Sequence, residues 1–95
     1  MSRTKLFLAW YTREGYPTMY AAAIDKEGLY ETFEGWRSGA MKTRRMLRRQ
    51  GADVERLVVD ADELVAWCVS EKRPLDGSAR AAFVALKGSQ LRSGG

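Results

Sequence analysis

Six basic side chains and no acidic ones lie between Arg37 and Arg49, so this segment carries a charge of +6. The whole chain has a net charge of +4, which leaves −2 for the remaining residues. Five of the six cations are arginines, whose planar guanidinium groups donate paired hydrogen bonds to phosphate or carboxylate oxygens and keep their charge at physiological pH. The segment therefore predicts a surface for an anionic partner, and the candidate residues are Arg37, Lys42, Arg44, Arg45, Arg48 and Arg49.

The spacing of these cations is that of two neighbouring rows along one helix. Arg37, Arg44 and Arg48 form the first row and Lys42, Arg45 and Arg49 the second, opposite the apolar residues Trp36 and Leu47. Such a face suits the backbone of a nucleic acid, and because no base-reading pattern accompanies it, we expect recognition without strong sequence specificity.

Two other interpretations of the same face remain open. It fits an acidic protein or nucleoprotein surface, which would make the chain a small inhibitor or adaptor. It also fits a solvated helix face in which arginine stems cover apolar surface. Glutamates elsewhere in the chain would favour this last interpretation by pairing with the arginines, and the candidates are Glu14, Glu27, Glu31 and Glu34.

Aromatic residues are the second group with a chemical use. Tyr16 stands beside Pro17 in a predicted loop, so we expect it to be exposed and include it among the contact residues. Tyr11, Tyr20 and Tyr30 fall on three successive predicted strands, where they form either part of the core or a platform for stacking bases. Exposure of these rings would favour nucleic-acid binding, and burial would argue against it.

Catalytic and metal-binding patterns are sparse. The sequence contains no histidine, one cysteine, no nucleophile motif and no phosphate-binding glycine loop, so we predict a non-enzymatic protein with no cofactor and no metal. Cys68 falls on the apolar side of a predicted helix and is expected to be buried. Asp60, Asp62 and Glu63 resemble a capping box more than a cation site, with Asp60 as the cap.

The predicted fold is an α+β domain with the order β-β-β-α-β-α-α, in which a small antiparallel sheet packs against two or three helices. A three-strand meander opens it, with a hairpin loop at residues 13–17, and residues 29–34 are either its third strand or the start of a helix. The predicted strands cover residues 5–12, 18–24, 29–34 and 54–59, and the predicted helices cover residues 36–50, 61–72 and 78–90.

Over residues 5–72 this element order resembles the beginning of the ribonuclease H-like fold. The resemblance implies metal-binding carboxylates in the first strand, in the first helix and after the fourth strand. Asp60 alone stands at such a position, because the first strand offers Trp10, Tyr11 and Thr12 and the basic helix has no acid. The residues therefore argue against a metal-dependent nuclease.

At 95 residues, with 45% of them apolar, the chain is expected to form one domain over residues 1–95, with a frayed tail at 91–95. The apolar run after the basic N-terminus is too short for a signal peptide or a membrane span, so we expect a cytoplasmic protein without a membrane partner. A homodimer through Trp67, Val69 and Leu75 is a further hypothesis.

Overall fold

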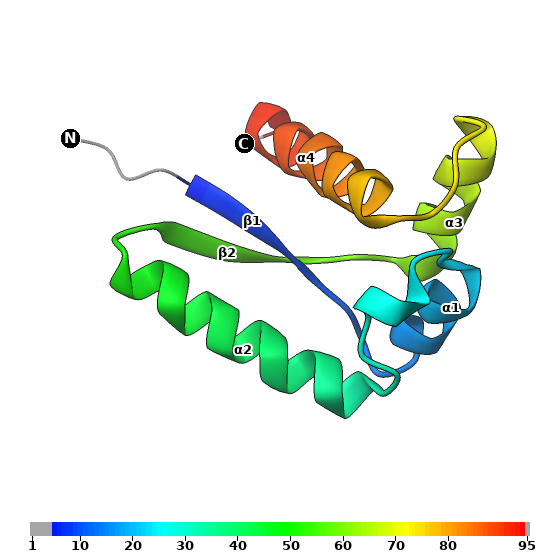
Figure 1. Ribbon diagram of the computed structural model, residues 1–95. Helices are drawn as coiled ribbons and strands as arrows, with labels where there is room; N and C mark the ends of the chain where they lie inside the picture. The colour runs from blue at the N-terminus through cyan, green and yellow to red at the C-terminus, as the bar shows by residue number, and fades with distance from the viewer. Residues whose placement is uncertain (1–4, 95) are drawn as a thin grey trace.

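The computed structural model describes residues 5–94, which form two strands, one short 3-10 helix and four α-helices (Figure 1). The order β-α-α occurs twice along the chain, with the 3-10 helix inserted in the first unit. The elements are β1 (Lys5–Trp10), α1 (Gly15–Ala22), η1 (Lys26–Gly28), α2 (Phe33–Arg49), β2 (Asp53–Val58), α3 (Ala61–Ser70) and α4 (Gly77–Gly94).

The two strands are parallel, and the predicted antiparallel meander is wrong. The register runs from Lys5 opposite Asp53 to Trp10 opposite Val58, and the Val59 N–H donates to the Trp10 carbonyl at 2.8 Å. Parallel strands need a long crossover connection, which residues 11–52 supply through α1 and α2. The resemblance to the ribonuclease H-like fold depended on the three-strand meander, so it fails as well.

The predicted second strand is helix α1. Pro17 sits in its first turn, where the missing N–H of proline costs no helix hydrogen bond. Tyr16, Met19 and Ala23 are buried at spacings of three and four residues, which is the period of a helix face and not that of a strand. The apolar run at residues 18–24 therefore packs as a helix, and the hairpin predicted before it does not form.

The predicted third strand at residues 29–34 is also absent, and a loop leads into α2 there. The hydroxyl of Thr32 accepts a hydrogen bond from the Gly35 N–H at 3.0 Å and caps α2, which therefore begins at Phe33 and not at Trp36. The alternative prediction, a helix that begins near Leu29, agrees better with the structure, although α2 begins four residues later, at Phe33.

The second half of the chain follows the prediction closely. β2 and α3 form at the expected places, and the Asp60 carboxylate accepts from the Glu63 N–H at 3.1 Å, which confirms the predicted cap. The last helix begins at Gly77, where Asp76 and not Ser78 provides the cap through the Ala79 N–H at 2.9 Å. This helix continues to Gly94, beyond the predicted end near Gln90.

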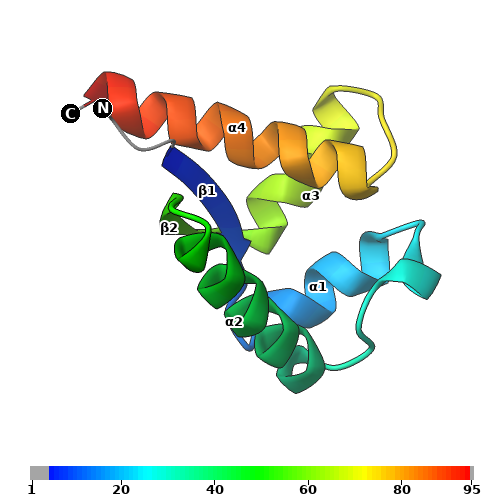
Figure 2. The ribbon, with the colours of Figure 1, turned by 60° about the vertical axis from the view of Figure 1, so that its left-hand side comes forward.

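Figures 1 and 2 show the strand pair between α2 on one side and α4 on the other, with α1 and α3 near the carboxyl ends of the strands. Trp36 of α2 packs against Trp10 and Tyr11, with both ring-centroid distances at 5.2 Å, and stacks on Tyr16 at 5.6 Å. Phe83 of α4 fills the core on the other side. These aromatic contacts fix one side of α2 on the domain and direct its opposite side to solvent.

Candidate functional site

Helix α2 holds all six predicted cations on one continuous element with defined ends. Its N-terminus is capped by Thr32, and its C-terminus is closed by Gly51, whose φ of 92° lies in the left-handed region. Arg48 and Arg49 stand in the last turn, where positive charge interacts favourably with the helix dipole. At 1.5 Å per residue the cations span about 18 Å along the helix axis.

Five of the six predicted cations are exposed, and they define what we call the basic face: Arg37, Lys42, Arg45, Arg48 and Arg49. Arg44 was also predicted on this face and is instead half-buried. Its Nε atom is buried and has no hydrogen-bond partner within the described part of the chain. Arg44 therefore stands at the border where α2 meets the rest of the domain.

None of the six cations forms an ion pair or a side-chain hydrogen bond within residues 5–91. Glu34, an acid at the start of the same helix, pairs with Arg13, whose guanidinium holds the pKa of the Glu34 carboxyl below its usual value. The internal neutralisation that would favour a merely solvated face is thus not present among these residues. Arginines placed four apart keep their mutual repulsion, which an external anion would relieve.

A shallow hollow of about 400 Å³ lies at the C-terminal end of α2. Arg45, Arg48 and Arg49 line it together with Ala52 from the turn that follows the helix. Three guanidinium groups around one hollow give a dense array of donors, which suits an anion with several acceptor oxygens.

The structure adds Arg56 to the cations of interest. It is exposed on β2, lies in register with Leu8, and packs its guanidinium 5.3 Å from the centroid of the Trp10 ring. Since Trp10 meets Trp36 of α2, Arg56 lies on the side of the sheet that α2 covers. The alternation of side chains along the predicted strand 54–59 was the signal that would have found it.

Tyr16 differs from its predicted placement, whereas Tyr11 and Tyr20 follow the core alternative. Tyr16 was expected in an exposed loop, but it is 1% exposed, and its hydroxyl donates to the Tyr30 carbonyl. Tyr11 is 4% exposed and Tyr20 is half-buried, so the three predicted strand tyrosines form no common platform. The burial of these two rings removes the triple stacking platform that would have favoured nucleic-acid binding and argues against it. Tyr30 is the exception, since 54% of it is exposed. Tyr16 is therefore a core residue, and Tyr30 replaces it as the surface aromatic near α2.

An apolar groove of about 640 Å³ runs along β1 between α2 and α4. Residues 5–9 of β1 form its floor, Trp36, Gly39 and Thr43 line the α2 side, and Ala81 and Val84 line the α4 side. Its volume falls within the range of pockets that hold small organic ligands. The sequence did not reveal this groove, because it depends on two helices that are far apart in the chain.

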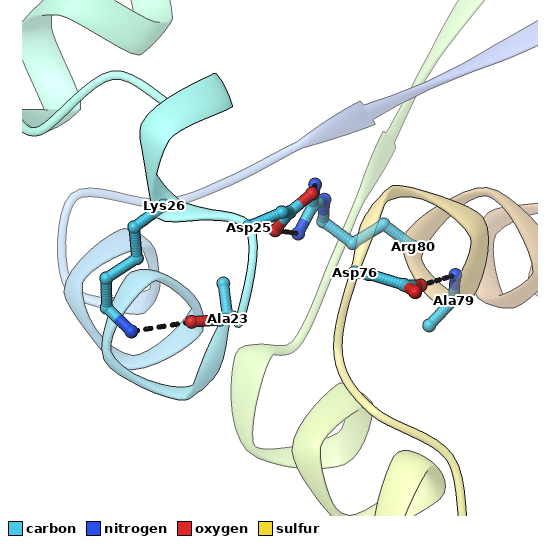
Figure 3. Close-up of polar contacts among 6 residues, drawn as sticks. All are labelled: Ala23, Asp25, Lys26, Asp76, Ala79 and Arg80. Atoms are coloured by element: carbon cyan, nitrogen blue, oxygen red, sulfur yellow. Dashed lines mark hydrogen bonds and ion pairs between the residues drawn. The ribbon is translucent and has the colours of Figure 1, made fainter.

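A polar cluster borders this groove where the loop after α1 meets the start of α4 (Figure 3). Arg80, which lines the groove, donates to both carboxylate oxygens of Asp25 at 3.1 and 2.6 Å. These hydrogen bonds lower the pKa of the Asp25 carboxyl. The Ile24 N–H donates to the Leu75 carbonyl at 3.0 Å beside this pair, so the cluster joins the two β-α-α units.

Polar side chains at the carboxyl ends of the two strands accept hydrogen bonds at the start of the helices that follow. Asp60 caps α3, and on the neighbouring strand end Thr12 accepts from the Gly15 N–H at 2.9 Å at the start of α1. Within residues 5–91, no group of three or more potential metal ligands comes together. Cys68 is buried as predicted, and burial raises the pKa of its thiol.

The surface proposed for a homodimer is not a single patch. Val69 is 74% exposed, but Leu75 is 4% exposed and belongs to the core, and Trp67 packs on Phe83 at 5.5 Å. One exposed valine is too small an apolar area to indicate an interface.

Comparison of the chain with models of known protein families, with curated proteins and with solved structures found no match. No helix within residues 5–94 is both long and apolar enough to cross a membrane. In this part of the chain, the basic face and the groove beside it are the two surface features with the chemistry of a binding site.

Proposed function

We propose that this protein is a non-enzymatic binding module that attaches to the phosphate backbone of nucleic acid through the basic face of α2. The observation that supports the proposal best is the absence of internal partners for the cations: among the described residues, all six remain without an ion pair on one helix. A row of unneutralised arginines gains most from a polyanion, because each phosphate contact releases condensed counterions.

The arrangement favours backbone contacts over reading of bases. The basic face is spread along about 18 Å of helix, which suits successive phosphates of one strand. Arginine supplies both charge and paired donors to each phosphate, and it needs no particular base sequence to do so. The aromatic core beneath α2 keeps the helix in place, so the helix positions that carry the cations are fixed before binding.

The test is the fluorescence anisotropy of labelled DNA and RNA titrated with the native protein and with an Arg45→Glu variant. A matched control is Lys72→Glu, which makes the same change in net charge at an exposed lysine outside α2. We expect Arg45→Glu to weaken binding about tenfold or more, the effect of removing a charge-assisted contact and adding a repulsive charge. The Lys72→Glu control should lose much less binding affinity than Arg45→Glu.

Two results would contradict the proposal. Equal losses in both variants would mean that only net charge matters, and no binding of the native protein even at low salt would remove nucleic acid as the partner. The same face would then have to be tested against acidic protein surfaces.

A further inference from the structure

Tyr30 is an exposed aromatic residue whose ring packs against α2. A Cβ atom built on Gly39 would lie 2.7 Å from the Tyr30 hydroxyl oxygen and 3.0 Å from its ring, so the ring occupies the space that the glycine leaves open. The hydroxyl of Tyr16 donates to the Tyr30 carbonyl and anchors the backbone of this residue. The position of Tyr30 is therefore fixed although 54% of it faces solvent.

The ring lies between the basic face and the apolar groove. At about 100° per residue, Lys42 is offset from Gly39 by about 60° around the helix and Arg49 by about 80° in the same direction. Gly39 itself lines the groove, as does Tyr30. Around the circumference of α2, the order is therefore Lys42 and Arg49 first, then the ring of Tyr30, and then the apolar groove.

The groove suits a flat, largely apolar ring that carries a few polar atoms. Leu29 and Trp36 line it, and Thr43 and Ser89 add hydroxyl groups at its margins. Among the described residues, the charged groups that line it are cations, Lys5 and Arg80, and no carboxylate does so. A nucleobase is such a ring. Its attached phosphate would meet Lys42, and a phosphate further along the strand would meet Arg49, which lies about 10 Å beyond Lys42 along the helix axis.

We propose that the nucleic acid is single-stranded, with its phosphates on the Lys42 and Arg49 side of the basic face and one base stacked on Tyr30 at the groove. This inference rests on the proposed function and narrows its substrate. Unpaired bases can leave the strand and stack on aromatic side chains, whereas the bases of a duplex are paired and stacked on each other. The basic face alone would bind both forms.

The decisive comparison is between an oligothymidylate and an abasic strand of the same length, which carries the same phosphates without bases. We expect the oligothymidylate to bind at least about fivefold more tightly, because stacking of one base on an aromatic side chain contributes that much or more. It should also quench the tryptophan fluorescence of a Trp67→Phe variant, whose two remaining tryptophans are Trp36, which lines the groove, and Trp10, which contacts Trp36. The abasic strand should bind without this quenching.

A Tyr30→Leu variant tests whether the tighter binding of oligothymidylate depends on the Tyr30 ring. Tyr30→Phe is the conservative control. Tyr30→Leu should weaken oligothymidylate binding about fivefold and leave abasic-strand and duplex binding unchanged, while Tyr30→Phe should retain the affinity of the native protein. Circular dichroism and urea unfolding of each variant check that the fold is intact. If Tyr30→Leu does not fold, Gly39→Ala provides a second variant that displaces the ring.

Equal affinity for the two strands, or equal quenching by both, would overturn the inference and leave the groove to another class of ligand, such as an apolar peptide. The proposed function would survive that result, because the abasic strand would still bind. Failure of the native protein to bind either strand would instead contradict the proposed function itself.

Discussion

Tyr11 shows how burial of a single residue leads to a pH-dependent stability. It follows β1, is 4% exposed, and its burial raises the pKa of the phenol from 10.0 to about 12. The fold therefore favours the neutral phenol, and above pH 10 the unfolded chain loses this proton before the folded chain does.

We accordingly expect the free energy of unfolding to fall as pH rises from 10 towards 12, by up to roughly 2–3 kcal/mol from this residue. Urea unfolding on both sides of this range measures the change. Part of the decline should remain in a Tyr11→Phe variant, because burial also raises the pKa of Tyr16. An identical decline in native protein and variant would show that Tyr11 is not responsible.

Exposure of single residues was predictable from the sequence where the element type was right. The helical spacing placed Arg45 and Arg49 correctly on the outside of α2. Arg44 is half-buried because the side of α2 that faces the domain extends further around the helix than Trp36 and Leu47 alone indicated. Tyr16 was wrongly predicted to be exposed, because the segment predicted as a loop forms helix α1 and Tyr16 lies on its buried side.

The C-terminal end of α2 depends on one glycine with a special backbone conformation. Gly51 has a φ of 92°, which residues other than glycine rarely adopt. A Cβ atom at this position would meet no atom within 4 Å. Any cost of substitution therefore comes from backbone strain and not from a clash.

We expect Gly51→Ala to lower the free energy of unfolding by about 1 kcal/mol or more. Gly28→Ala is the matched control, since its Cβ also has open space and its φ is not in the left-handed region. Denaturant unfolding of both variants measures the difference. A loss at Gly28 as large as that at Gly51 would contradict the assigned role of the φ angle.

Elements with local start and stop signals were the ones that the sequence revealed. Asp60 marks the start of α3 and Gly51 the end of α2, and both signals act within a few residues. Helix α1 was misassigned because an apolar run of seven residues satisfies both strand and helix patterns over so short a length. Tyr16, Met19 and Ala23 are buried and lie three and four residues apart, a spacing that fits one face of a helix and not one face of a strand.

At the scale of the whole molecule, two β-α-α units are joined by the parallel strand pair and by the contact between Asp25 and Arg80 (Figure 3). The side chain of Arg80 is 14% exposed and that of Asp25 is 37% exposed, so solvent weakens the pair on one side. It joins residues that are 55 positions apart in sequence.

An Arg80→Met variant, which keeps the apolar stem, should lose about 1 kcal/mol of stability near neutral pH. Because Arg80 lowers the pKa of Asp25 below 3.8, the contribution of the pair is present above that pH and is lost as pH falls through the lowered value. The gap between native protein and variant in urea unfolding should therefore narrow in acid. A gap that stays constant with pH would contradict the role of this carboxylate.

Strand pairing was the part of the fold that the sequence could not reveal. The pairing of β1 with β2 joins segments that are 48 residues apart, and nothing local at Lys5 or Asp53 indicates a parallel partner. The groove depends on the same long-range arrangement, because β1, α2 and α4 form it together. The five cations of the basic face, by contrast, lie on one helix and were found from sequence.

The most direct test of the central claim is the salt dependence of binding to single-stranded and duplex nucleic acid. For three to five phosphate contacts, a plot of log affinity against log salt concentration should have a slope between about −2 and −3.5 for single strands and between about −2.7 and −4.5 for a duplex. An Arg45→Glu/Arg49→Glu variant should lose about two contacts, with a correspondingly shallower slope and weaker binding. A flat salt dependence in the native protein, or an unchanged slope in this variant, would contradict the proposal that the basic face of α2 binds the phosphate backbone.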